Sequence, residues 1–182
     1  MPFEFSRLLI HDVILVKSAR FYDERGCFSE TYKKSEFFKN GITAEFNQSN
    51  YSLSKRDVLR GLHYQLAPKS QGKLVSAMSG SIFDVAVDIR KSSPHFGKWV
   101  SCILSAKDGK ALWVPEGFAH GFLALEDDTL VNYKTTEEYS KEHERGVLWN
   151  DPAINISWPI KDPIISEKDK NYPPLKDADV FH

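Results

Sequence analysis

Residues 83–89 read Phe-Asp-Val-Ala-Val-Asp-Ile, and no other stretch of the chain says as much about the fold. Its apolar residues alternate with Asp84, Ala86 and Asp88, and a period of two is typical of a β-strand. A strand places alternate side chains on opposite faces. The stretch therefore predicts a strand with two distinct faces, either of which could point into a barrel.

Strand-like segments lie on both sides of this stretch. Upstream, residues 73–78 are followed by the turn signal Ser79-Gly80-Ser81, which predicts a hairpin with the strand at 83–89. Downstream, short polar segments rich in Gly, Asp and Pro separate four further predicted strands, at residues 99–104, 111–114, 121–125 and 129–133.

Helical segments are scarce. Only residues 34–40 and 140–145 have a composition that fits one or two helical turns, and residues 163–182 are expected to form a tail laid over the domain. Short strands at close spacing favour an antiparallel sandwich or barrel. Since no repeat or linker interrupts the chain, we predict a single all-β domain over residues 1–182.

Composition narrows the class of protein. The 182 residues carry 24 Lys and Arg against 25 Asp and Glu, and a formal charge of −1 argues against a nucleic-acid binder. No apolar run approaches the ~18 residues that span a bilayer, and no secretory signal is visible. Two isolated cysteines, Cys27 and Cys102, are expected to be reduced thiols. These features predict a cytoplasmic protein without a membrane partner.

Residues 115–120, Pro-Glu-Gly-Phe-Ala-His, fit the PxGxxH pattern of cupins, which are double-sheet jelly-roll barrels. In metal-binding cupins the histidine of this pattern, here His120, joins a His-x-His pair. His63 is followed by Tyr64 and Gln65, so that pair is absent. Two ligands are too few for a stable divalent site, and we predict a cupin-type jelly roll without a metal.

His63 is the residue best suited to general base catalysis, because the ordinary pKa of histidine lies near neutral pH. A catalytic histidine usually needs a carboxylate that fixes its tautomer. Asp84, Asp88 and Asp169 are candidates, and spacing alone does not choose among them. Three basic residues could bind phosphates or stabilise an oxyanion: Arg25, Arg60 and Lys73.

Beyond these single residues, ten segments match one known pattern in order and spacing: residues 21–30, 47–52, 58–65, 71–75, 83–90, 93–99, 114–122, 150–152, 158–159 and 166–169. Through these segments nearly the whole chain resembles the sugar-nucleotide 3,5-epimerases, a cupin-fold family. Two departures are an aspartate, Asp57, where a glycine is expected, and a short C-terminal tail.

The resemblance implies cofactor-independent epimerisation at C3 and C5 of dTDP-4-dehydro-6-deoxy-D-glucose, which gives dTDP-4-dehydro-L-rhamnose. It assigns the base to His63 paired with Asp169, and a proton donor on the opposite sugar face to Tyr133. Lys73 and His120 would stabilise the enolate oxygen.

The same resemblance implies a nucleotide site. Tyr139 would stack on the thymine ring, and Arg25 and Glu30 would reach the site of a neighbouring subunit, so a homodimer is expected. The remaining implied substrate contacts are Gln48, Asn50, Arg60, Glu144 and Lys168.

Three alternatives stay open at this point. A relative could invert C3 only, or act on another nucleotide or a heptose. A non-catalytic sugar-nucleotide-binding cupin would need neither a base nor an acid. A metal-dependent cupin oxygenase would need the ligands that the sequence lacks.

Overall fold

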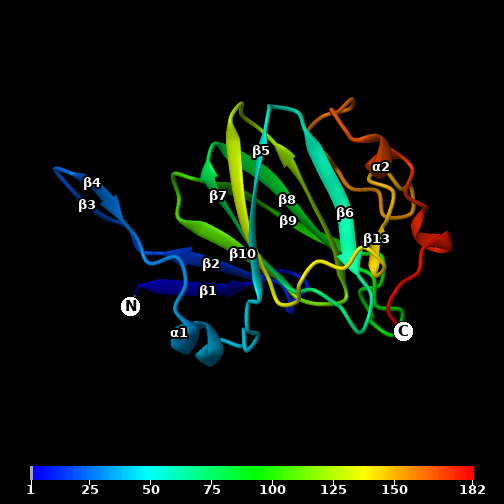
Figure 1. The fold of residues 1–182 in the computed structure, drawn as a ribbon, viewed down its shortest axis with the longest axis horizontal. Coiled ribbons are helices and arrows are strands. Elements are labelled where there is room, and N and C mark those ends of the chain that lie inside the picture. The colour runs from blue at the N-terminus through cyan, green and yellow to red at the C-terminus, as the bar shows by residue number, and fades with distance from the viewer. Residues whose placement is uncertain (1) are drawn as a thin grey trace.

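Two antiparallel sheets face each other in the computed structural model, which describes residues 2–182 (Figure 1). The six-stranded sheet has the order β1 (Phe3–Arg7), β2 (Ile14–Ser18), β10 (Lys110–Val114), β7 (Lys73–Ser79), β12 (Thr129–Thr135) and β5 (Gln48–Ser54). The five-stranded sheet has the order β13 (Glu144–Gly146), β6 (Leu59–Gln65), β11 (Phe118–Ala124), β8 (Ser81–Asp88) and β9 (Trp99–Ser105). The predicted all-β, double-sheet jelly roll is confirmed.

Both faces of β8 are buried. Ile82 and Ala86 belong to the core between the sheets, on the face that also carries Asp84. Val85 and Val87 pack on the opposite face against apolar residues of the C-terminal part of the chain. The aspartates of the alternating stretch therefore point toward the barrel interior, which the sequence had left undecided.

The predicted hairpin between β7 and β8 is wrong. The strand β7 pairs with β10 and β12, whereas β8 pairs with β9 and β11 in the other sheet. The turn at Gly80 carries the chain from one sheet to the other, with a φ of +67° and the side chain of Thr129 where a Cβ would lie. Strand pairing in a jelly roll is non-local, so a good turn signal does not identify the partner strand.

The helical predictions divide. The segment at 34–40 forms α1 (Lys34–Lys39), but residues 140–145 form a turn that runs into β13. Pairing of β13 with β6 outweighs the weak local preference for a helix. A short helix α2 (Glu167–Lys170) and a 3₁₀ turn η1 (Leu175–Asp177) lie in the C-terminal segment. No helix within residues 2–182 is long and apolar enough to cross a membrane.

The C-terminal segment lies over the outer face of the five-stranded sheet. Leu175 and Val180 are buried there with Leu62 and Val87, so the segment contributes to the core rather than only covering it. Asp57, which stands where a glycine was expected, adopts a φ of +66°. Aspartate tolerates this left-handed conformation better than most residues, so the turn forms with Asp57 in place of a glycine.

A two-stranded arm projects from the body of the molecule. It consists of β3 (Phe21–Asp23) and β4 (Gly26–Phe28), and Figure 1 shows it on the side opposite to α2. Phe21, Tyr22 and Phe28 are 56%, 69% and 66% exposed. Residues 2–182 therefore leave the three aromatic rings of the arm largely uncovered.

Candidate active site

A cavity of about 750 Å³ opens between the two sheets. Strands β5, β7 and β12 of one sheet and β6 and β11 of the other line it, together with the β12–β13 loop and the chain around α2. Every predicted site residue except Arg25 and Glu30 lies in its wall. These are His63, Lys73, Tyr133, Asp169, Gln48, Asn50, Arg60, His120, Tyr139, Glu144 and Lys168.

Asp169 is the carboxylate that pairs with His63. The Nε2 atom of His63 lies 2.8 Å from one carboxylate oxygen, and the other accepts the backbone N–H of Gly61 at 3.1 Å. The hydroxyl of Ser166 caps α2 by accepting the N–H of Asp169. Burial raises the pKa of Asp169, but the hydrogen bonds from His63, Gly61 and Ser166 outweigh it and lower the pKa overall. The carboxylate is thus held ionised beside the ring.

Close backbone packing sets the position of His63. Gly61 has a φ of +131°, and a Cβ there would lie 2.5 Å from the Cα of Gly121. Two glycines therefore let β6 and β11 approach closely, which side chains would prevent. In this register His63 is paired directly with His120 across the sheet, next to a register shift between His120 and Phe122. Both imidazoles consequently reach the same cavity.

The other two candidate carboxylates have different partners. Asp84 is fully buried and lies 2.7 Å from Nε2 of His120, while its second oxygen has no hydrogen-bond partner within residues 2–182. Asp88 forms an ion pair with Arg90 at 2.6 Å. Two histidines of the cavity wall are therefore each paired with a carboxylate: His63 with Asp169, and His120 with Asp84, which lies behind the wall. The sequence did not predict the second pair.

Lys73, the first residue of β7, lines the same cavity. Its Nζ donates a hydrogen bond to the backbone oxygen of His63 at 3.1 Å. Burial lowers the pKa of Lys73 to about 8, against the opposing effect of the negative charges of Asp84 and Glu144. A buried ammonium whose pKa lies near neutral is well suited to stabilise a developing oxyanion, because water does not screen it.

Tyr133 faces the cavity from β12, in the sheet opposite to His63. Burial raises the pKa of its hydroxyl, an effect that the nearby Arg60 opposes and Glu144 reinforces. The phenol therefore stays protonated at neutral pH. A base and a proton donor thus stand on opposite walls of one cavity.

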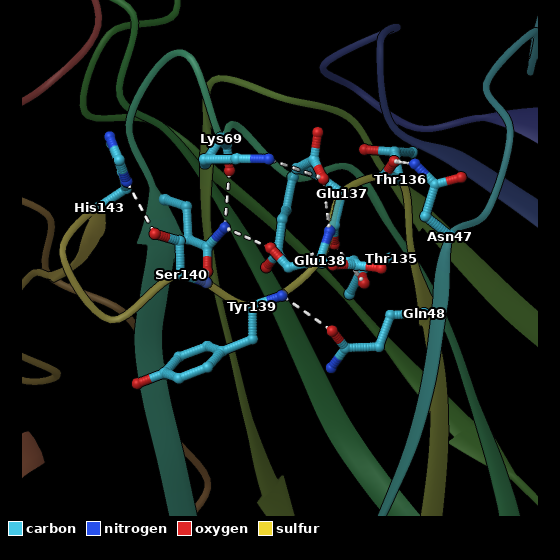
Figure 2. A network of polar contacts seen from close by, with 12 residues as sticks. Asn47, Gln48, Lys69, Thr135, Thr136, Glu137, Glu138, Tyr139, Ser140 and His143 are labelled. Carbon is cyan, nitrogen blue, oxygen red and sulfur yellow. Dashed lines mark hydrogen bonds and ion pairs between the residues drawn. The ribbon is translucent and has the colours of Figure 1, made fainter.

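The far end of the cavity is a connected polar network. The hydroxyl of Tyr139 donates to Glu144 at 2.9 Å, and Glu144 forms an ion pair with Lys168 at 2.6 Å. Figure 2 shows the backbone N–H of Tyr139 pointing to the side-chain oxygen of Gln48, at 2.8 Å. Gln48 donates in turn to Asn50 at 2.8 Å. The exposed ring of Tyr139 offers a flat surface near the ammonium group of Lys168 and the side-chain amide of Gln48.

Of three further predicted nucleotide or phosphate contacts, one lies in the cavity wall and two lie outside it. Arg60 lies at the cavity mouth and donates to Ser54 and to a backbone oxygen. Arg25 lies on the arm, exposed and ion-paired with Asp23 at 2.5 Å, and Glu30 follows the arm. Neither residue reaches the cavity of its own chain.

Sequence reasoning missed some site residues. Tyr172 packs edge-on against the His63 ring with 5.7 Å between centroids, and Gln65 lies buried in the cavity wall. A single tyrosine in a proline-rich tail carries no signal of this contact. Gln65 did have one, since it follows His63 by two residues on a strand and so shares its face.

No group of three His, Cys, Asp or Glu side chains within residues 2–182 is arranged to hold a metal ion. The histidines of the cavity are each directed at a carboxylate rather than at one another. Chemically, the arrangement can remove a proton on one side of a substrate, hold negative charge beside Lys73, and return a proton from the other side.

Known proteins similar to this chain in sequence and fold share one family name. A sequence model of the family described as dTDP-4-dehydrorhamnose 3,5-epimerase matches residues 7–177. The curated protein of that name from Shigella flexneri is 53% identical over 173 residues, covering 94% of this chain and 96% of the relative. The solved structure from Sulfolobus tokodaii has a TM-score of 0.93 at 49% identity and full coverage of both chains. A structure from Legionella pneumophila, solved with dTDP-4-keto-L-rhamnose, has a TM-score of 0.93 at 40% identity, covering 97% of this chain and 95% of that one. The chain therefore belongs to the dTDP-4-dehydrorhamnose 3,5-epimerase family.

Proposed function

We propose that this protein is an isomerase that inverts C3 and C5 of dTDP-4-dehydro-6-deoxy-D-glucose and releases dTDP-4-dehydro-L-rhamnose. The family and the ligand of the Legionella relative support the substrate. The observation that carries the reaction is the pair formed by His63 with Asp169 and, across the cavity, Tyr133.

The chemistry follows from the ketone at C4. Protons on both neighbouring carbons are acidic because their removal gives an enolate, whose negative charge is delocalised onto the C4 oxygen. With its Nε2–H donating to Asp169, His63 keeps a lone pair on Nδ1 for the substrate proton, and Asp169 stabilises the resulting imidazolium. Lys73 and His120 hold the enolate oxygen, where negative charge develops.

Inversion requires two faces. A histidine that returned the proton to the face it came from would regenerate the substrate. Tyr133 instead delivers a proton from the other wall, which leaves His63 protonated and Tyr133 ionised. After His63 has released its proton to water and Tyr133 has taken one from water, the same pair of residues acts on the second carbon. The protonated state of the Tyr133 hydroxyl, favoured by burial, suits this role.

The nucleotide is proposed to lie toward Tyr139. Its ring stacks on thymine, while Gln48, Asn50 and Glu144 contact the nucleoside. Arg60 and Lys168 neutralise the diphosphate, for which guanidinium and ammonium groups at a cavity mouth are well suited.

A homodimer completes the site in this proposal. Arg25 and Glu30 lie outside their own cavity, and the arm that carries Arg25 exposes three aromatic rings. Insertion of this arm against a second copy of the chain would bury the rings and bring both residues to the partner's nucleotide. The single-domain, cofactor-free and cytoplasmic assignments stay predictions.

Proton NMR in D₂O tests the function with purified, metal-stripped protein and dTDP-4-dehydro-6-deoxy-D-glucose. Loss of both the C3 and C5 proton signals is the expected result, and His63→Ala should abolish it. Loss at C3 alone would identify a C3 epimerase. Binding of dTDP without exchange at either carbon would overturn the enzymatic proposal in favour of a binding protein.

A further inference from the structure

Gln65, the last residue of β6, hydrogen-bonds through its side-chain amide to two loops, the β6–β7 connection and the β12–β13 connection. Its side chain is buried, with 2% of the residue exposed. The Nε2 group donates to the backbone oxygens of Lys69 at 2.7 Å and Glu138 at 3.2 Å. The Oε1 atom accepts the backbone N–H of Ser140 at 2.8 Å. Both amide hydrogens and the carbonyl oxygen are therefore used, which makes this a specific contact rather than a filler of space.

Two of these bonds bracket Tyr139. Glu138 and Ser140 are its neighbours in the chain, and the N–H of Tyr139 itself donates to Gln48 at 2.8 Å (Figure 2). Three consecutive backbone units are thus tied to side chains of β6 and β5. Such a segment has little freedom left before any ligand arrives.

The other end of the loop returns to the same place. The backbone of Gln65 is paired with Glu144 in the β6–β13 ladder, and Leu66 donates its N–H to the oxygen of His143 at 3.0 Å. The hydroxyl of Ser140 and Nδ1 of His143 lie 2.8 Å apart and close the turn between them. The segment 138–144, which connects β12 of one sheet to β13 of the other, is therefore held to Gln65 at both of its ends.

We propose that Gln65 is a positioning residue that pre-forms the nucleotide end of the cavity, holding Tyr139 and Glu144 in their binding geometry. The inference rests on the proposed function, in which Tyr139 stacks on thymine. Pre-ordering the loop removes its ordering cost from binding. Because Gln65 follows His63 by two residues on β6, one strand sets both the base and the nucleotide end, and hence the distance between them.

The variant Gln65→Glu tests this with almost no change in volume. It keeps an acceptor for Ser140 but loses both N–H donors and sets a carboxylate against two carbonyl oxygens. We expect the dissociation constant for dTDP and the KM to rise about 10- to 100-fold, with kcat within about threefold of the parent. Amide hydrogen exchange at residues 138–143 should accelerate in the ligand-free protein.

Two further variants sharpen the test. Gln65→Met removes the hydrogen bonds without adding charge, so it should give a smaller change in the same direction if the carboxylate variant folds poorly. Asn47→Asp is the matched control. Asn47 is exposed and donates one bond to Thr136 at 2.8 Å, earlier in the same connection, and its loss should change dTDP affinity less than about twofold.

Unchanged dTDP affinity and unchanged exchange in a folded Gln65 variant would overturn the inference. So would a fall in kcat at constant KM, since it would move the role of Gln65 to the reacting end. If the parent protein itself bound no dTDP, the proposed function would fail instead, while the exchange data would still report whether Gln65 orders the loop.

Discussion

At the scale of single residues, the proposed reaction assigns separable roles to the two walls of the cavity. His63 and Tyr133 stand on strands of different sheets, so each can be replaced without touching the other's supports. A variant of one of them therefore dissects the reaction into proton removal and inversion.

Tyr133→Phe should uncouple exchange from inversion. His63 can still remove a proton and return deuterium to the same face, so NMR in D₂O should show deuterium entering with retained configuration. Formation of the L-sugar should fall by about 10²- to 10⁴-fold. A variant that inverted at the parent rate would show that Tyr133 is not the donor, and His63→Ala, which should neither exchange nor invert, is the control.

The lowered pKa of Lys73 predicts how kcat/KM falls on the alkaline side of the pH profile. Its ammonium is charged below its pKa of about 8 and neutral above it, so kcat/KM should fall as pH rises through that value. Fold stability should move in the opposite direction, because above pH 8 the unfolded chain still binds the proton that the folded chain has released. Urea unfolding measured across the same pH range distinguishes local titration from denaturation.

Lys73→Met supplies the complementary measurement. Loss of one oxyanion-stabilising group typically lowers kcat by about 10²- to 10³-fold, and the residual activity should no longer decline near pH 8. If the decline persisted, a different group would be responsible for it.

At the scale of elements, periodicity predicted some strands and missed others for identifiable reasons. The alternation in β8 is regular, so the strand was predictable from its sequence. In β6 the glycine that packs against Gly121 interrupts the pattern, and that strand carries His63. The glycine that allows the close packing behind His63 therefore also makes β6 hard to predict from periodicity.

Which strands pair with one another was even harder to predict from the sequence. The turn at Gly80 is a sound local prediction, but which strands pair depends on contacts far apart in the chain. The choice of Asp169 over Asp84 and Asp88 likewise rests on packing of the C-terminal segment, and only the family resemblance indicated it beforehand. The pair formed by Asp84 and His120 had no signal of that kind.

Gly61→Ala tests the close approach of β6 and β11. A Cβ at Gly61 would meet the backbone of Gly121, so we expect a loss of about 1–3 kcal/mol in the free energy of unfolding and a drop in activity as His63 shifts. Gly26→Ala is the matched control. Gly26 has nearly the same φ, +129°, but no atom within 4 Å of an added Cβ. Equal losses in urea unfolding for the two variants would show that contact with Gly121 contributes nothing.

At the scale of the whole molecule, the arm and the cavity are two parts that do not meet within one chain. Figure 1 shows the arm projecting from the body of the fold on the side opposite to α2, and none of residues 21–28 lines the cavity. The side chain of Arg25 is 84% exposed. In the proposed dimer the arm packs against the second subunit, and Arg25 adds a cation to the nucleotide site of that subunit.

Mixing two variants, one that should bind the nucleotide weakly and one that should not turn over, tests that arrangement. In a heterodimer of Arg25→Ala with His63→Ala, one cavity has its own His63 and receives Arg25 from the other subunit. Random assembly after co-refolding should therefore restore about one quarter of the sites. Arg25→Ala alone should bind dTDP more weakly, and a mixture no more active than its components would place Arg25 in its own chain's site or in none.

The position of Asp169 has a consequence for the order of events in folding. Asp169 lies 106 residues after His63 and reaches it only through the docked C-terminal segment. A chain whose two sheets have already closed still lacks a competent base until that last segment settles onto them. During refolding, weak nucleotide binding through Gln48, Arg60 and Tyr139 should therefore reappear before turnover. Full affinity should return together with turnover, because docking of the same segment also supplies Lys168.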